Sequence, residues 1–243
     1  MEVYSLGRAP YQLTCALQER LRTRVQQGGP EVLLLCEHPP VLTLGRSATT
    51  DDVLADEQLL RAQGIEVART SRGGQVTYHG PGQLVVYPIV RLRRGIVAHV
   101  EWLAQAAVEL AAQHGISARY DRGQVGVFVG EQKLAAIGVN VARRVTMHGM
   151  ALNVTSEATR PFGQRWFVPC GNRQGRAISL EEAAASPPAL AEPAQSQPPS
   201  TCPLSVDSVG EQLAAILLRR AEVPAFVAQH TSVALLSQSL FVE

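Results

Sequence analysis

The sequence predicts a mixed α/β fold, in which a β-sheet with parallel and antiparallel neighbours is flanked by helices. Amphipathic helical stretches alternate with short apolar stretches of strand length, as helix crossovers between strands require. Residues 125–141 instead show two strand patterns joined by a tight glycine turn, which is typical of an antiparallel hairpin. The chain has 243 residues and 46% of them are hydrophobic, enough for one sizeable core.

The first predicted elements are a helix and two buried strands. Residues 10–27 are amphipathic, with proline at the start and glycine after the end, and this predicts a helix. The apolar runs 32–36 and 41–44 predict two buried strands. The His-Pro-Pro run at 38–40 between them indicates a rigid turn.

The later elements follow the same alternation. Residues 52–63 predict a helix, 65–69 a strand, 84–90 a β-branched strand and 96–114 the longest helix. The predicted hairpin consists of strands 125–129 and 133–141, and a further strand at 150–154 completes the sheet. Lys133 is thus expected where a turn enters a strand.

The domain organisation follows from a change in composition near the C-terminus. Residues 1–182 are expected to form one catalytic domain. Residues 183–203 are rich in Pro, Ala, Ser and Gln and are interpreted as a flexible insertion. In the remaining segment, 204–243, a helical pattern at 205–222 is expected to dock back on the domain, whereas the end of the chain is ambiguous.

Charge and composition exclude several classes of protein. The formal net charge of +1 argues against a non-specific nucleic-acid binder. No apolar run of about 18 residues occurs and the N-terminus lacks a signal-peptide pattern, so neither a membrane protein nor a secreted one is expected. The four cysteines show neither the close pairs of a zinc site nor the density of a disulfide scaffold. We therefore expect a cytoplasmic protein without a metal.

The basic residues are 21 arginines and a single lysine, Lys133. The pKa of an ammonium group can be moved toward neutrality by its surroundings, whereas a guanidinium stays charged. Lys133 is therefore a candidate acid or base, although an ordinary surface lysine is the simpler interpretation.

A glycine-rich stretch runs from Arg72 to Gln83 and contains His79. Its glycines would let backbone N–H groups approach a ligand closely. The spacing matches neither the phosphate-binding Walker loop nor the dinucleotide fingerprint. A ligand-binding loop is the hypothesis, and a plain glycine turn is the alternative.

Cys170 is the strongest candidate nucleophile among the cysteines. It stands between Pro169 and Gly171, which would fix the backbone around a thiol at the tip of a loop. Most free cysteines are small buried hydrophobes instead, and Cys15 and Cys36 fit that description because they lie within apolar patterns.

Lys133 and Cys170 together make a specific chemistry available. An ammonium beside a thiol lowers the thiol's pKa and stabilises the thiolate that attacks thioesters. His79 and His148 are further candidates for orienting a carbonyl or moving protons, whereas His38, between a strand and two prolines, is expected to be structural.

The run from Arg72 to Gln83 resembles the signature of the octanoyltransferases of lipoate biosynthesis. The blocks that follow the family's order are Glu37-His38-Pro39, Gly126-Val127 with Lys133 and Gly138, His148-Gly149-Met150-Ala151-Leu152-Asn153, and Pro169-Cys170-Gly171. The resemblance covers most of residues 1–182, and the proline-rich insertion departs from it.

The resemblance implies a fold similar to the catalytic domain of biotin and lipoate protein ligases. It also implies that Cys170 carries an acyl thioester and that Lys133 tunes it. The residues expected to bind substrate are Arg72, Gly73, Gly74, Gln75, Val76, Thr77, Tyr78, His79, Ala136, Ile137, Gly138, His148, Gly149, Met150 and Ala151. Backbone N–H groups near Gly73 or Ala136 could hold the oxyanion that forms during transfer.

The expected reaction moves an octanoyl group from octanoyl-acyl carrier protein to a lysine ε-amine of an acceptor, with no cofactor and no nucleotide. The resemblance implies that the acceptors are lipoyl domains of 2-oxoacid dehydrogenase complexes and the glycine cleavage H protein. Two alternatives remain open: an ATP-dependent lipoate or biotin protein ligase, and a non-catalytic module that binds an acyl carrier. A ligase would need ATP and would not need Cys170.

Overall fold

The computed structural model describes residues 1–164, 166–168, 176–186, 204–222 and 229–241. Its centre is a sheet with the strand order β11-β1-β2-β6-β10-β9-β8-β7. Strand β1 runs parallel to β2 and β11, whereas all the other neighbours in this sheet are antiparallel. The predicted mixed α/β fold is therefore confirmed. The strands are β1 (Glu2–Arg8), β2 (Val32–Glu37), β6 (Gln83–Ile89), β7 (Arg119–Asp121), β8 (Gly126–Val129), β9 (Gln132–Ala142), β10 (Val145–Asn153) and β11 (Gln229–His230).

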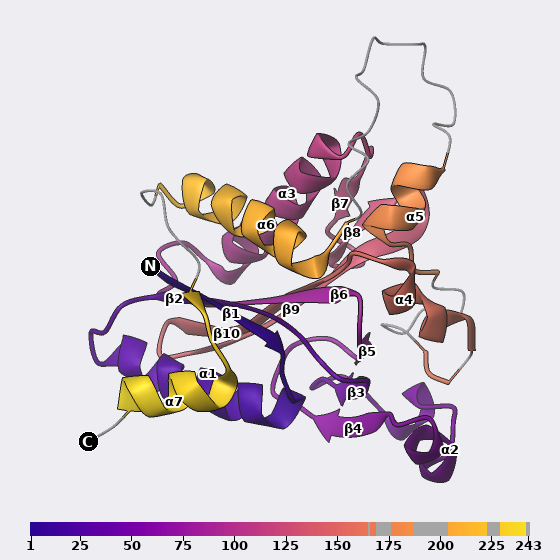
Figure 1. Ribbon diagram of the computed structural model, residues 1–243, viewed down its shortest axis with the longest axis horizontal. Coiled ribbons are helices and arrows are strands. Elements are labelled where there is room, and N and C mark those ends of the chain that lie inside the picture. Colours follow the sequence, from indigo (N-terminus) through magenta and orange to yellow (C-terminus); the bar gives the residue numbers. More distant parts are fainter. Residues whose placement is uncertain (165, 169–175, 187–203, 223–228, 242–243) are drawn as a thin grey trace.

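Helices cover both faces of the large sheet (Figure 1). On one face, α3 (Ile96–Gln113) packs against α6 (Val206–Arg220), and their buried side chains share a core with Leu33 and Val86 of the sheet. On the other face, α1 (Tyr11–Gln26) lies beside α7 (Val233–Phe241) and against β6 and β10. Both faces of the central strands are thus buried, which explains why these strands are apolar runs rather than alternating ones.

A second, smaller sheet has the strand order β4-β3-β5. It consists of β3 (Val41–Leu44), β4 (Glu66–Arg69) and β5 (Val76–His79), with α2 (Glu57–Ala62) and the 3₁₀ turn η1 (Thr50–Asp52) beside it. The predicted rigid turn at 38–40 carries the chain from the large sheet to the small one. The glycine-rich stretch 72–83 contains β5 of the small sheet and leads into β6 of the large one, so it connects the two sheets.

Short elements follow the last long strand: α4 (Ser156–Thr159), the 3₁₀ turn η2 (Arg160–Gln164) and α5 (Leu180–Ala185). Helix α5 has a full capping box between Ser179 and Glu182. It occupies residues 183–185, the first part of the predicted insertion, whereas 187–203 lie outside the described residues. The helix predicted at 205–222 is confirmed as α6, which Ser205 caps.

Several elements differ from the sequence-based expectation. The helix predicted from residue 52 begins only at Glu57, because Asp56 caps it and Val53 pairs with Phe167 instead. The sequence does not predict the strands β1, β5, β7 and β11, and the strand expected at 150–154 begins earlier, at Val145, because it pairs with β9 along its length. Among the described residues, no helix combines the length and apolarity that crossing a bilayer requires.

Candidate active site

Two adjoining hollows lie where the small sheet meets β9 and β10. The outer cavity, of about 500 Å³, is lined by Gly74, Gln75, Val76, Thr77, Tyr78, Gln83, Gly123, Gln124, Val125, Phe128, Glu131, Lys133, Ala136, Ile137, Ala151, Asn153, Phe162, Arg176 and Ala177. Its volume is within the range of small-molecule sites.

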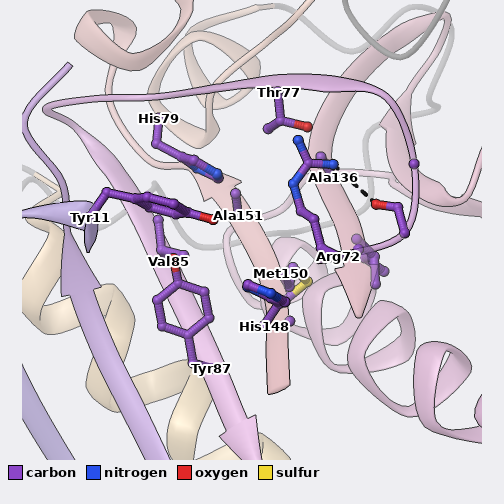
Figure 2. A pocket seen from close by; sticks show the side chains of 15 residues that line it. Tyr11, Arg72, Thr77, His79, Val85, Tyr87, Ala136, His148, Met150 and Ala151 are labelled. Atoms are coloured by element: carbon purple, nitrogen blue, oxygen red, sulfur yellow. Dashed lines mark hydrogen bonds between the residues drawn. The ribbon is translucent and has the colours of Figure 1, made fainter. Parts of the chain in front are cut away.

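The inner chamber, of about 40 Å³, is lined by Tyr11, Arg72, Gly73, Gly74, Thr77, His79, Val85, Tyr87, Ala136, Ile137, Gly138, His148, Gly149, Met150 and Ala151 (Figure 2). The two hollows share the wall residues Gly74, Thr77, Ala136, Ile137 and Ala151. All fifteen residues predicted to bind substrate line one hollow or the other, with Gln75, Val76 and Tyr78 facing only the outer one.

The glycine-rich stretch is pressed between the small sheet and β9. A Cβ atom at Gly45 would lie 2.2 Å from the carbonyl oxygen of Gly74, and one at Gly138 would lie 3.0 Å from that of Gly73. The N–H of Gly73 donates to Val139 (3.0 Å), so this N–H, one of the suggested oxyanion donors, is already occupied. Close backbone packing therefore fixes this stretch, and the N–H of Gly73 is not available to a ligand.

Arg72 places a guanidinium group inside the protein beside the inner chamber. It is 7% exposed, and its Nη2 donates to the carbonyl oxygen (2.6 Å) and the hydroxyl (2.8 Å) of Thr43 on β3. In Figure 2, Arg72 lies across the chamber from His79 and Tyr11. Its positive charge disfavours a second charge nearby, and it helps burial to lower the pKa of both His79 and His148.

A chain of hydrogen bonds joins the inner chamber to Lys133. Nδ1 of His79 donates to Oε1 of Gln83 (2.7 Å), whose Nε2 donates to Oδ1 of Asn153 (2.9 Å). Nδ2 of Asn153 then donates to the backbone carbonyl of Lys133 (3.4 Å). Because Nδ1 of His79 is the donor and burial keeps the ring neutral, Nε2 is a hydrogen-bond acceptor.

His148 has a strained backbone in the middle of β10, with φ at +61°. Its N–H donates to Oε1 of Gln18 (2.9 Å), and its Nε2 lies 3.2 Å from the hydroxyl of Ser71. Burial, together with Arg72 and Arg22, lowers the pKa of His148 to about 3. Its Nδ1 is buried without a hydrogen-bond partner. A neutral ring with an unsatisfied nitrogen at the chamber is a candidate for contact with substrate or water.

Lys133 lies at the start of β9 and is half-buried. Its Nζ donates to the backbone carbonyl of Gln124 (3.3 Å) and lies 5.2 Å from the centre of the Phe128 ring. Its backbone N–H donates to Arg176 (2.8 Å), and its carbonyl accepts from Ile178 (3.1 Å). The only lysine of the chain therefore has its ammonium in the outer cavity and its backbone held on two sides.

Cys170, the predicted nucleophile, falls in the range 169–175 and is outside the described residues. The described residues on either side of this range are fixed. Val168 donates its N–H to Asp52 (2.8 Å), and Arg176, which lines the outer cavity, accepts from Lys133. Cys202 also lies outside the described residues.

Cys15, Cys36 and His38 behave as the sequence predicts for structural residues. Burial raises the pKa of Cys15 to about 11 and that of Cys36 further, so both thiols stay protonated. Nδ1 of His38 donates to the carbonyl of Ala9 (2.6 Å), so its Nε2 accepts from the hydroxyl of Tyr87 (2.8 Å).

Sequence reasoning missed several residues that line the two hollows. Tyr11 and Tyr87 come from α1 and β6, far from any motif, and nothing local marks them. Gln83 and Asn153 stand inside motifs that the sequence singles out, and their amide groups were the available signal. Phe128 and Gln124 become relevant only once the hairpin places them beside Lys133. Within the described ranges, no group of three or more His, Cys, Asp or Glu side chains could hold a metal ion.

Comparison with solved structures supports the fold. The chain is similar to lipoate-protein ligase A bound with ATP, with a TM-score of 0.74 and 18% identity over 99% of this chain and 94% of that one. It is also similar to a bi-partite lipoate protein ligase from Thermoplasma acidophilum, with a TM-score of 0.72 and 17% identity over 99% of this chain and 92% of that one. Identities this low establish the fold alone, and the predicted likeness to lipoate ligases is confirmed.

Comparison with curated proteins establishes the family. The chain is 41% identical to the octanoyltransferase of Acidobacterium capsulatum, over 78% of this chain and 83% of that protein. It is 45% identical to the octanoyltransferase of Geobacter metallireducens, over 70% of this chain and 78% of that protein. Residues 10–196 match the lipoyl protein ligase A/B catalytic domain. Because this match covers most of the chain, the protein belongs to the lipoyl protein ligase A/B catalytic domain family.

Proposed function

We propose that this protein is an octanoyltransferase of protein lipoylation. In this reaction an octanoyl group passes from octanoyl-acyl carrier protein to Cys170, and from Cys170 to the ε-amine of a lysine on a lipoyl domain. The acceptors are lipoyl domains of 2-oxoacid dehydrogenase complexes and the glycine cleavage H protein. The relatives named octanoyltransferase support the activity.

One observation about geometry carries the proposal. The only lysine of the chain, Lys133, lines a cavity of about 500 Å³ that adjoins a buried chamber. Ala136, Ile137 and Ala151 form part of the wall between the two hollows, so an acyl chain that starts near Lys133 would meet apolar surface on its way inward. An amine at one end of a largely apolar site suits acyl transfer.

The chemistry balances without a cofactor. The amine of Lys133 takes the proton of the Cys170 thiol, and the thiolate attacks the carbonyl carbon of the octanoyl thioester. The bond between that carbon and the carrier sulfur then breaks, and the Lys133 ammonium returns the proton to the leaving thiolate. In the second half, the acceptor amine attacks the carbonyl carbon of the Cys170 thioester and an amide bond forms. The bond between that carbon and the Cys170 sulfur breaks, and the proton lost by the amine passes through Lys133 to the Cys170 thiolate. Because an amide is more stable than a thioester, no nucleotide is needed.

Intact mass measurement tests the proposal directly. After mixing with octanoyl-acyl carrier protein, we expect one added octanoyl mass, which is lost in the Cys170→Ser variant and which disappears when a lipoyl domain is added. The Cys36→Ser variant is the matched control, because the Cys36 thiol is buried and stays protonated. An adduct that survives in Cys170→Ser, or no adduct under turnover conditions, would contradict the acyl-enzyme route.

The same assay separates the alternatives. An ATP-dependent lipoate or biotin ligase would form product only after ATP is added and would retain its rate in Cys170→Ser. A non-catalytic binding module would bind the carrier without any covalent adduct. The scattered cysteines and the reducing conditions that a free thiol requires favour a cytoplasmic location.

A further inference from the structure

We propose that Phe128 is a positioning residue that holds the Lys133 ammonium in the outer cavity through the face of its aromatic ring. This inference rests on the proposed function, because it assigns Phe128 a role through Lys133. It goes beyond that function by naming the device that aims the lysine. Four features of the hairpin formed by β8 and β9 support it.

The first feature is a β-bulge that turns Lys133 toward the cavity. Val127 pairs with Ala135 and Phe128 pairs with Lys133, so Leu134 has no partner on β8. Leu134 and Ala135 are both buried in the core, whereas Lys133 lines the outer cavity. In a regular strand Lys133 and Ala135 would point to the same face, and the lysine would enter the core. The extra residue places Lys133 on the cavity side. Bulges near active sites commonly redirect a side chain in this way.

The second feature is the cross-strand pair that the bulge creates. Directly paired residues of antiparallel strands present their side chains on the same face, and Phe128 is the direct partner of Lys133. Phe128 is 3% exposed, and the ammonium lies 5.2 Å from the centre of its ring. This distance is within the range of a cation–π interaction. Arg119 lies 5.5 Å from the same ring, but it is ion-paired with Asp121 (3.1 Å) and Glu131 (3.5 Å).

The third feature is the space that Gly126 leaves for the lysine side chain. A Cβ atom at Gly126 would lie 3.1 Å from Cε of Lys133, 3.3 Å from the Phe128 ring and 2.8 Å from the carbonyl oxygen of Ala135. Any larger residue would force the lysine stem and the ring apart. Glycine at this position therefore permits the contact between Lys133 and Phe128.

The fourth feature is a strained turn that supplies the ammonium with a hydrogen-bond acceptor. Val125 has a φ of +39°, which is rare for a β-branched residue. The neighbouring Gln124 presents its backbone carbonyl to Nζ of Lys133 at 3.3 Å. Glu131 and Arg176 are the other charged residues that line the outer cavity within the described ranges, and no ion pair joins Lys133 to either of them. Phe128 and Gln124 are thus the groups that hold the ammonium.

The test is the pH dependence of Cys170 alkylation by iodoacetamide, read from the Cys170 peptide by mass spectrometry in the full-length protein. A thiol assisted by a held ammonium reacts at lower pH. We expect the midpoint to rise by about half a pH unit when Phe128 is replaced by 3,4,5-trifluorophenylalanine, which keeps the ring's shape and weakens its negative face. Phe128→Leu should raise the midpoint at least as far, and Phe128→Tyr should retain the original midpoint.

Phe162→Leu is the matched control, because Phe162 also lines the outer cavity but packs against Tyr78 and Phe167 instead of a cation. It should leave the midpoint unchanged. If the trifluorinated protein and Phe162→Leu give the same midpoint as the unchanged protein while Lys133→Met raises it, the role of Phe128 is overturned and the proposed function stands. If Lys133→Met does not raise the midpoint, the pairing of Lys133 with Cys170 in the proposed function fails instead.

Discussion

The two hollows of the site differ in which of their side chains are charged and which are neutral. In the outer cavity, Lys133 is half-buried and its ammonium is held by a carbonyl oxygen and an aromatic ring. In the inner chamber, Arg72 is the charged group, and the neighbouring rings of His79 and His148 have a pKa far below the ordinary histidine value. Burial and the fixed guanidinium keep those histidines neutral, whereas the ammonium of Lys133 is only partly buried in the outer cavity.

The two hollows share lining residues, but this difference suits them to different tasks. A group that must gain and lose a proton needs partial solvent access, because full burial would fix its protonation state. The inner chamber, whose histidine rings stay neutral, suits an apolar group instead, because a new charge there would be buried without compensation. Ala136 and Ala151 line both hollows, so the two environments meet at these residues.

The largest effect is expected from removing the outer charge. Lys133→Met keeps the length of the side chain but removes its proton and charge, and octanoyl transfer should fall about 1,000-fold, the usual size of an acid–base contribution. Single-turnover transfer to a lipoyl domain measures it. Arg94→Met is the control, since Arg94 is an exposed cation that lines neither hollow. A loss of less than tenfold in Lys133→Met would contradict the assignment.

The next effect concerns the neutral histidines of the inner chamber. The folded pKa of His148 is about 3, below the unfolded value near 6.5, so the unfolded chain binds more protons in acid. Its contribution to stability is complete above pH 6.5 and is lost progressively as pH falls from 6.5 toward 3. At pH 4.5 the loss is on the order of 2 to 3 kcal/mol. Urea unfolding at pH 7 and 4.5 should show a smaller pH difference in His148→Asn, because asparagine tolerates positive φ and does not titrate.

The matched control is Gln113→Asn, which exchanges one amide for another at an exposed position of α3. It should leave the pH dependence of unfolding as it is. An equal pH dependence in the unchanged protein and in His148→Asn would mean that His148 is not held neutral by the chamber.

A smaller effect is expected at the shared wall. Ala136→Leu adds three carbons between the two hollows. It should lower kcat/KM for octanoyl transfer about tenfold, because one or two methylenes of the acyl chain lose their apolar burial. Transfer of the shorter butanoyl group should be unaffected. Ala112→Leu makes the same change on the exposed side of α3 and should affect neither substrate. Equal losses for both chain lengths would show that the wall does not separate two compartments.

The smallest effect is expected at the turn of the outer cavity. Val125→Gly removes the strain of a β-branched residue at φ +39° but adds freedom to the unfolded chain, for a net stabilisation of about 1 kcal/mol. Calorimetry should show a Tm higher by about 3 °C. A lower Tm would mean that the Val125 side chain, which is 40% exposed, contributes more through packing than it costs in strain.

The sequence predicted the fold wherever a local pattern was strong. Long amphipathic runs located α1, α3 and α6 within two residues at each end, and the glycine turn located the β8–β9 hairpin. Strand β1 was not predicted, because it is identified as a strand by its pairing with β2 and β11, contacts that no local pattern encodes. The helix expected from residue 52 is shortened for the same reason, since Val53 pairs with Phe167, 114 residues away along the chain.

The sequence identified residues of the site but not their arrangement in space. The motifs identified many of the residues that line the two hollows, because glycines and histidines in apolar surroundings stand out in a sequence. The bulge at Leu134 could not be foreseen, since alternation along 133–139 looks regular until the register with β8 is known. Phe128 gave no signal either, because an aromatic residue in a strand is usually part of the core.

The hydrogen bonds from His79 through Gln83 and Asn153 to the backbone of Lys133 have a consequence for how such an enzyme can change. We expect a substitution that displaces His79 to shift the backbone of Lys133 as well, because the two amides join them directly. A designer who reshapes the inner chamber should therefore check the position of the lysine and, where it has moved, restore it with a second substitution at Gln83 or Asn153.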